Sequence, residues 1–135
     1  NVSENLTAKG GYRLAAAKAA RKVVLLATGS EVAIALDAAA KLEAQGIGAD
    51  VVSMPCWEAL DAQPAAYRAG LLPADALIVS VEAGVTLGWE RYTGNDGLNI
   101  GIDSFGASAP IEALYDHFGL TADKITARIV ARLNR

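Results

Sequence analysis

The chain has 135 residues, a formal net charge of −3, one Cys and one His, with 53% hydrophobic and 20% charged residues. This composition excludes a disordered chain, and a domain of this size buries about two-thirds of its surface around one core. A single Cys excludes a disulfide framework and a thiolate zinc cluster. The acidic balance argues against nucleic-acid and anionic-membrane partners, and no apolar run is long enough to span a bilayer. We therefore expect one soluble, cytoplasmic α/β domain.

The N-terminal segment predicts a linker followed by two strands. The chain starts at Asn1 without Met, and its polar residues 1–9 are expected to be a linker from a longer protein. After Gly10-Gly11, residues 12–14 are predicted as a short strand, and 18–22 as a basic, solvated connection. The apolar run 23–27 is typical of a strand that is buried on both faces in a parallel sheet.

A helix is predicted over residues 32–45, with Ser30 as its N-cap and with Asp37 and Lys41 paired on its outer face. Gly46 and Gly48 end this helix, and a parallel strand follows over 47–53. The helix is expected to bury one apolar face, formed by Val32, Ala35, Leu36, Ala39 and Leu42.

The second half predicts short elements, because Pro55, Pro64 and Pro73 exclude one long helix over 54–73. The first four predicted elements are a short helix over 65–69, a buried strand over 76–81 ending at Glu82, a short helix over 88–92 and a strand over 98–102. A helix capped by Ser108 follows, and its inward face is formed by Ile111, Leu114, Tyr115 and Phe118. A final helix is capped by Thr121, and its inward face is formed by Ile125, Ile129 and Leu133. Alternating strands and helices predict a three-layer α/β/α sandwich in one domain.

The carboxyl ends of these strands form a candidate ligand site. Gly29, Ser30, Glu82 and Ser108 are expected at one edge of the sheet, where a turn leads into a helix N-terminus that can attract an anion. The turn lacks the remaining glycines of a dinucleotide fingerprint and the Gly-Lys-Ser/Thr of a phosphate loop. An ordinary N-cap is the competing interpretation.

Other chemistry-bearing residues give no complete catalytic site. His117 is the only His and is expected at a solvated helix end, and Cys56 is expected to be an inert thiol. The basic stripe of Lys124, Arg128 and Arg132 is interpreted as a solvated helix face rather than a phosphate site. Five aromatic residues are expected to pack sheet edges or a partner surface, namely Trp57, Trp89, Tyr92, Phe105 and Tyr115.

Short motifs follow one another over nearly the whole chain. They are KGGY at 9–12, ATGSEV at 27–32, VVSMP at 51–55, WE at 57–58, DAQ at 61–63, YR at 67–68, LP at 72–73, VEAG at 81–84, GW at 88–89, RY at 91–92, FGASAP at 105–110 and FGLT at 118–121. In this order and spacing they resemble the C-terminal domain of transketolase. Each motif alone is weak, but the ordered set is specific, and Cys56 departs from it where a Ser is usual.

The resemblance implies a fold and a parent enzyme. The fold is a five-stranded mixed sheet whose first short strand is antiparallel, spanning residues 10–135 after a linker over 1–9. The parent is a cytoplasmic homodimer of the pentose phosphate pathway that moves a two-carbon ketol unit between sugar phosphates with thiamine diphosphate and Mg²⁺. The family binds cofactor and substrates on its two other domains, and 95–97 (NDG) does not match its Gly-Asp-Gly motif. No catalytic, cofactor or metal residue is therefore expected in this chain.

Three functions remain open at this point. The first is a structural, dimer-supporting domain of transketolase, inactive when isolated. The second is a regulatory module that binds an anion or nucleotide at the carboxyl edge. The third is the same domain of a related thiamine-diphosphate enzyme such as dihydroxyacetone synthase.

Overall fold

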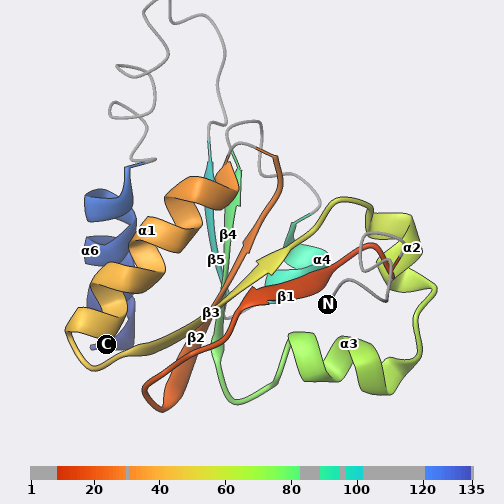
Figure 1. Cartoon of the computed structure of the whole chain (residues 1–135), viewed down its shortest axis with the longest axis horizontal. Coiled ribbons are helices and arrows are strands. Elements are labelled where there is room, and N and C mark those ends of the chain that lie inside the picture. Colours follow the sequence, from red (N-terminus) through yellow and green to blue (C-terminus); the bar gives the residue numbers. More distant parts are fainter. Residues whose placement is uncertain (1–8, 30, 83–88, 95–96, 102–120, 135) are drawn as a thin grey trace, which may run out of the picture.

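The sheet sets the architecture of the chain, a computed structural model of which describes residues 9–29, 31–82, 89–94, 97–101 and 121–134 (Figure 1). The strand order is β1-β3-β2-β4-β5, with β1 antiparallel to β3 and all other pairs parallel. This confirms the mixed sheet implied by the resemblance. The strands are β1 (Tyr12–Ala15), β2 (Arg21–Ala27), β3 (Gly48–Ser53), β4 (Leu77–Glu82) and β5 (Leu98–Gly101).

Helices cover both faces of the sheet, which confirms the predicted three layers (Figure 1). One face carries α1 (Glu31–Ala44) and α6 (Ala122–Leu133), and the other carries α2 (Trp57–Asp61), α3 (Ala65–Leu71) and α4 (Glu90–Thr93). Among the helices of the described ranges, none has both the length and the apolar character needed to cross a membrane.

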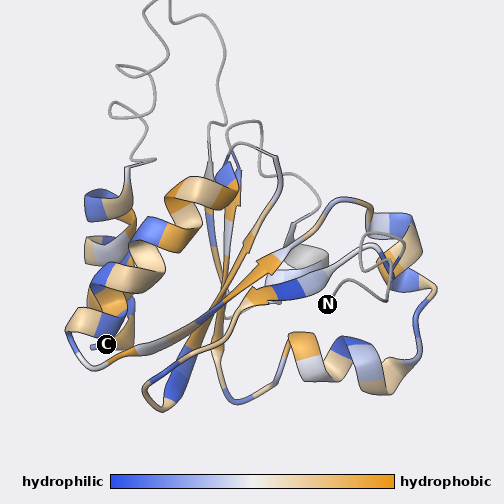
Figure 2. Cartoon of the chain, in the orientation of Figure 1, coloured by the Kyte–Doolittle hydropathy of each residue, from blue (hydrophilic) through white to orange (hydrophobic). Residues whose placement is uncertain are grey.

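The central strand β2 supplies side chains to both cores. Residues 23–27 are fully buried. Because side chains alternate along a strand, Val23 and Leu25 join the core under α1 and α6, while Val24 and Leu26 join the core under α2, α3 and α4. Burying each such side chain contributes about 1.5–3 kcal/mol. Apolar residues accordingly concentrate on the central strands in Figure 2, and within β2 the hydrophilic residues lie at its start. The prediction that residues 18–22 are all a connection was wrong, since Arg21 and Lys22 belong to the strand.

Gly46 ends α1 as predicted, and it does so through a defined hydrogen-bonded cap. Gly46 has φ +80, its N–H donates to the carbonyl of Glu43 at 2.9 Å, and the N–H of Ile47 donates to the carbonyl of Leu42 at 3.0 Å. This is the Schellman pattern of a helix C-terminus. The prediction that Gly48 also ends this helix was wrong. It is the first residue of β3, and a side chain there would overlap the carbonyls that end the β1–β2 connection.

The inner face of α1 is rotated from the predicted one because α6 packs beside it. Leu36 is 37% exposed and Ala38 is buried. Lys41 forms an ion pair with Asp123 of α6 at 2.9 Å instead of the predicted pair with Asp37. The hydrogen bond and charge of Asp123 raise the pKa of Lys41, and Asp37 adds a smaller effect of the same sign.

Several elements differ from their predicted bounds. The predicted helix over 65–69 extends to Leu71, and the helix predicted over 88–92 is observed as α4 (Glu90–Thr93). The final helix begins directly after its predicted N-cap Thr121, whose Oγ1 accepts a hydrogen bond from the N–H of Lys124 at 3.3 Å. α2 was not predicted: it has five residues, and Cys56 at its N-cap gives no side-chain cap. The predicted helix after Ser108 lies outside the described residues.

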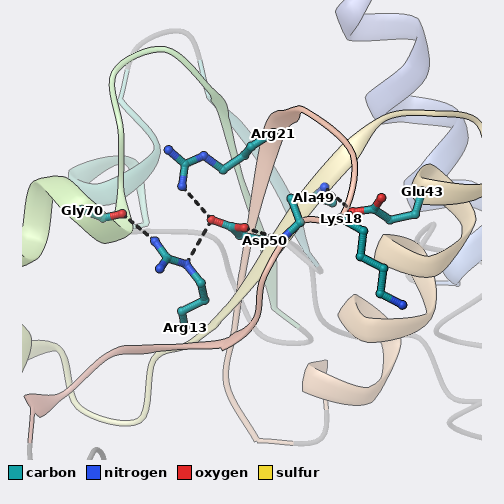
Figure 3. A network of polar contacts seen from close by, with 8 residues as sticks. Arg13, Lys18, Arg21, Glu43, Ala49, Asp50 and Gly70 are labelled. Atoms are coloured by element: carbon teal, nitrogen blue, oxygen red, sulfur yellow. Dashed lines mark hydrogen bonds and ion pairs between the residues drawn. The ribbon is translucent and has the colours of Figure 1, made fainter.

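A buried carboxylate joins four segments of the fold. The side chain of Asp50 on β3 is 3% exposed, and its Oδ2 accepts hydrogen bonds from Arg13 Nε at 3.2 Å and Arg21 Nη1 at 3.0 Å. Its Oδ1 accepts from the N–H of Ala17 at 2.7 Å. Arg13 also donates to the carbonyl of Gly70 at 2.8 Å, so the network reaches α3 (Figure 3). Because a buried carboxylate needs its oxygens satisfied, these contacts fix β1, β2, β3 and α3 relative to one another.

Glu43 of α1 holds the connection between β1 and β2. Its Oε2 accepts from the N–H groups of Lys18 at 2.9 Å and Ala49 at 3.1 Å, and its Oε1 accepts from that of Ala19 at 2.9 Å (Figure 3). These backbone hydrogen bonds, that of Lys18 first, favour the ionised carboxyl and lower the pKa of Glu43 below its ordinary value of 4.5.

The chain enters the domain through what we call the N-terminal clasp, formed by Lys9, Gly10, Gly11 and Tyr67. The carbonyl of Gly10 accepts from the N–H of Cys56 at 3.1 Å, and the hydroxyl of Tyr67 donates to the carbonyl of Gly11 at 2.7 Å. Lys9 Nζ lies 4.9 Å from the centroid of the Tyr67 ring, within the range of a cation–π interaction. Gly10 has φ +82, and a Cβ there would overlap the backbone of α2.

The clasp predicts that Gly10 tolerates a side chain far less than another glycine of the same conformation. Gly46 has a similar positive φ, but a Cβ there meets no atom within 4 Å. Gly46→Ala should therefore cost about 1–2 kcal/mol of stability from backbone strain alone. Gly10→Ala adds a backbone overlap that costs a further 1–3 kcal/mol or so. Urea unfolding of the two variants measures the difference, and equal losses would contradict the close contact with α2.

The lowered pKa of Glu43 predicts a pH dependence. A carboxyl whose pKa is lower in the folded state stabilises the fold above its ordinary pKa, and this contribution is lost as the pH falls through the lowered value. Glu43→Gln should reduce stability at neutral pH and flatten the decline between neutral pH and pH 3. Unfolding curves measured across this range test it. Asp37→Asn is the control, and an equal change in that variant would contradict a specific role for Glu43.

Candidate functional site

The predicted carboxyl edge lies where the strand order changes direction. From β2 the chain passes to β3 on one side and later to β4 on the other, which is the switch point where open α/β sheets bind ligands. Thr28 Oγ1 donates to Glu82 Oε1 at 3.3 Å, which joins the ends of β2 and β4 across this point. The predicted residues Gly29 and Glu82 therefore share one edge. Ser30 and Ser108 lie outside the described residues.

The start of α1 beside this edge carries negative charge. The N–H of Glu31 donates to the carbonyl of Thr28 at 3.2 Å, and that of Val32 to the carbonyl of Gly29 at 3.3 Å. Gly29 has φ +55, and the space next to its Cα is open. Glu31 is buried in the first turn, where its carboxylate interacts favourably with the helix dipole. The negative charges of Glu31 and Glu82 at this edge oppose the binding of an anionic ligand.

Three of the aromatic residues singled out in the sequence pack against one another. The rings of Trp57 and Trp89 lie 4.7 Å apart at 69°, and those of Trp57 and Tyr92 lie 5.2 Å apart at 76°. Both are edge-to-face contacts that stabilise a core. The hydroxyl of Tyr92 donates to Asp61 Oδ1 at 3.1 Å, so α4 is fixed to α2. Packing of these three at the sheet is confirmed, whereas Phe105 and Tyr115 lie outside the described residues.

Two buried polar side chains of the sheet, Asp50 and Ser80, were not predicted from the sequence. Asp50 and Ser80 each lie between two apolar residues inside a strand, and this isolated polar position is the signal that could have identified them. Ser80 is fully buried, and its hydroxyl donates to Asn99 Oδ1 at 2.8 Å. Thr93 donates to the same oxygen at 3.0 Å. Ser80 and Asn99 therefore form a structural network and not an exposed nucleophile.

The remaining candidates are placed as follows. Cys56 is half-buried, and its Sγ donates to Glu58 Oε1 at 3.7 Å, whereas reactive thiols sit in electropositive surroundings. Lys124 and Arg128 of the basic stripe are exposed on α6 and Arg132 is half-buried. His117 lies outside the described residues. In the parts of the chain that the structure describes, no group of three or more His, Cys, Asp or Glu side chains could hold a metal ion.

A shallow groove of about 610 Å³ runs between the second half of α1 and α6. Small side chains line most of it, among them Ala44, Ala127 and Ala131, and the Lys41–Asp123 ion pair borders it. The titratable side chains that line this groove are those of this exposed ion pair.

Known proteins similar to this chain share one description. The family model of the transketolase-like TK C-terminal domain matches residues 10–121. A transketolase of Sinorhizobium medicae is 49% identical over 134 residues, which cover 98% of this chain and 19% of that protein. The plasmid-encoded transketolase of Cupriavidus necator is 57% identical over 120 residues, covering 89% of this chain and 18% of that protein.

Solved structures agree with this likeness. A transketolase from Pichia stipitis matches with a TM-score of 0.86 and 35% identity, covering 95% of this chain and 18% of that one. A split-gene transketolase, described as an inactive β4 tetramer, matches with a TM-score of 0.74 and 25% identity, covering 92% of this chain and 42% of that one. The chain spans about a fifth of the length of the curated relatives it matches. It belongs to the family of transketolase C-terminal domains.

Proposed function

We propose that this chain is the C-terminal domain of a transketolase, which transfers a two-carbon ketol unit from a ketose phosphate to an aldose phosphate in the pentose phosphate pathway. The observation that carries the proposal is the 49% identity to a transketolase over 98% of this chain. We take residues 10–135 as the domain and 1–9 as the linker, in keeping with a family match that begins at residue 10.

The role of the domain in this proposal is structural. Its described polar side chains bond mainly to one another and to the main chain: Asp50 to two arginines, Glu43 to three N–H groups, and Thr28 to Glu82. Such closed networks stiffen a fold but leave no activated nucleophile or base. A rigid domain of this kind supports the rest of the subunit and the contacts of a homodimer.

Thiamine diphosphate and Mg²⁺ are assigned to the other domains of the same chain, together with the sugar-phosphate substrates. When bound, thiamine diphosphate supplies the centre that stabilises the carbanion of the transferred unit. The described residues of this chain do not fit the metal, because none of their carboxylates, His or Cys side chains form a group that could ligate it. We assign no reaction step to them.

The enzyme is proposed to act as a cytoplasmic homodimer. A matching structure is described as a split-gene transketolase, an inactive β4 tetramer. That description supports self-assembly of a polypeptide that contains a domain of this fold.

The test compares the purified 135-residue chain with the full-length protein that contains it. The full-length protein should transfer ketol units when thiamine diphosphate and Mg²⁺ are supplied, and the chain alone should show background turnover. Calorimetric titration of the chain with both cofactors should give no heat of binding. Tight binding by the chain, or a full-length protein without ketol transfer, would contradict the proposal. A donor-substrate comparison separates transketolase from dihydroxyacetone synthase.

A regulatory anion or nucleotide site at the carboxyl edge is the second candidate, favoured by the position of Gly29 and Glu82 at the switch edge. Ser30 and Ser108, which were predicted with them, lie outside the described residues. The carboxylates of Glu31 and Glu82 oppose it. We therefore expect no thermal shift with phosphate, sugar phosphates or nucleotides. A ligand at 100 times its dissociation constant would add about 2.7 kcal/mol of stability. A shift that Thr28→Val abolishes would support the second candidate instead.

A further inference from the structure

One helix of the domain has little internal support. α3 has seven residues and buries only Leu71, with Tyr67 half-buried. Helices this short are not stable in water without packing partners. Besides the packing of Leu71 and Tyr67 against the core, α3 is held by the hydrogen bond from Tyr67 to Gly11 and by the bond from Arg13 to the carbonyl of Gly70. By contrast, α1 buries five residues along its length and packs beside α6.

Small residues make up most of the outer face of α3. Ala65, Ala66 and Ala69 are exposed, as is Arg68. Arg68 Nε donates to the carbonyl of Gln63 at 3.2 Å, so part of its charge is already engaged. Alanine loses almost no side-chain entropy on burial and allows another backbone to approach closely. This composition suits a packed surface, but alone it does not identify the partner.

The N-terminal clasp identifies where a partner would come from. Lys9 lies over the ring of Tyr67, and Gly10 is fitted against the backbone of α2. The point at which the chain reaches the domain is thus fixed directly beside α3. Eight residues can extend about 28 Å at most, so a body joined through the proposed linker starts within that distance of α3.

The length of the relatives shows that such a body is large. This chain covers 19% of a transketolase to which it is 49% identical and matches a family model of the C-terminal domain. We infer that the exposed face of α3, beside the clasp, is the surface on which the preceding part of the same transketolase chain packs. The inference rests on the proposed function and adds the location of the intramolecular contact. The alanine-lined groove of α1 and α6 is a weaker candidate because these two helices cover the opposite face of the sheet from α3 (Figure 1).

A matched pair of variants in the full-length protein tests the inference. Ala66→Arg places a long charged side chain on the α3 face, and Ala40→Arg places it on exposed α1, across the sheet. Arginine is a good helix former, so neither variant should unfold its own helix. Circular dichroism and hydrogen exchange of the core strands check that both remain folded.

The readouts are the rate of protease cleavage within residues 1–9 and amide exchange of residues 65–71. Ala66→Arg should accelerate cleavage by about tenfold and raise exchange in α3, because cleavage follows the population of the undocked state. Ala40→Arg should match the wild type. Equal effects of the two variants, or none, would overturn the inference.

Two further outcomes are distinguishable. If Ala66→Arg halves the molecular mass by light scattering but leaves cleavage unchanged, the α3 face contacts a second copy of the chain, and the inference is wrong. If the wild-type full-length protein lacks ketol transfer, the proposed function fails, while cleavage and exchange still report on docking because they do not depend on activity.

Discussion

A carboxylate buried in a sheet has to be surrounded by donors, and this requirement at Asp50 determines how the first third of the chain is arranged. The required donors come from Arg13 on β1, Arg21 on β2 and the N–H of Ala17 between them. A lone buried carboxylate would cost several kcal/mol, so the connection from β1 to β2 has to pass close to β3. Glu43 then fixes the next two N–H groups of this connection from the side of α1.

The same network explains how an edge strand with one exposed arginine is held in a defined place. β1 pairs with β3 over only a few residues, and its register shifts between Arg13 and Ala15. Such a strand has little pairing energy of its own. The guanidinium of Arg13 links it to Asp50 on one side and to α3 on the other, while Tyr67 fixes the residues just before it. The end of the domain that carries the N-terminal clasp is therefore built mainly from directional polar contacts, and the sheet interior from apolar packing.

Sequence alone was sufficient where one local signal decides the structure. The apolar run 23–27 predicted the central strand, and Gly46 predicted the end of α1. It was insufficient where a distant segment decides. Lys41 pairs with Asp123, and the inner face of α1 is rotated toward Ala38, because α6 packs there. α2 was not predicted because a helix of its length is too short to show the hydrophobic periodicity of a helix in the sequence.

For the candidate site, strand ends placed Gly29 and Glu82 at one edge correctly. The hydrogen bond from Thr28 to Glu82 and the burial of Glu31 depend on tertiary contacts that no sequence motif reveals. The position of Asp50 was visible as a lone acid in an apolar strand, but its two arginine partners lie 29 and 37 residues away in sequence. Side chains that close a network over such separations cannot be paired from spacing alone.

The strand order has a kinetic consequence. β2 is complete by residue 27, yet its neighbour β4 begins at residue 77, and β5 joins the sheet only after that. Most strand pairing therefore needs closure of long chain segments before any stabilising contact is gained, which places the domain among slow-folding topologies with millisecond-to-second phases or thereabouts. During synthesis on a ribosome, β2 would wait for about fifty residues with one edge open. Its buried valines and leucines would meanwhile be available to chaperones or to aggregation.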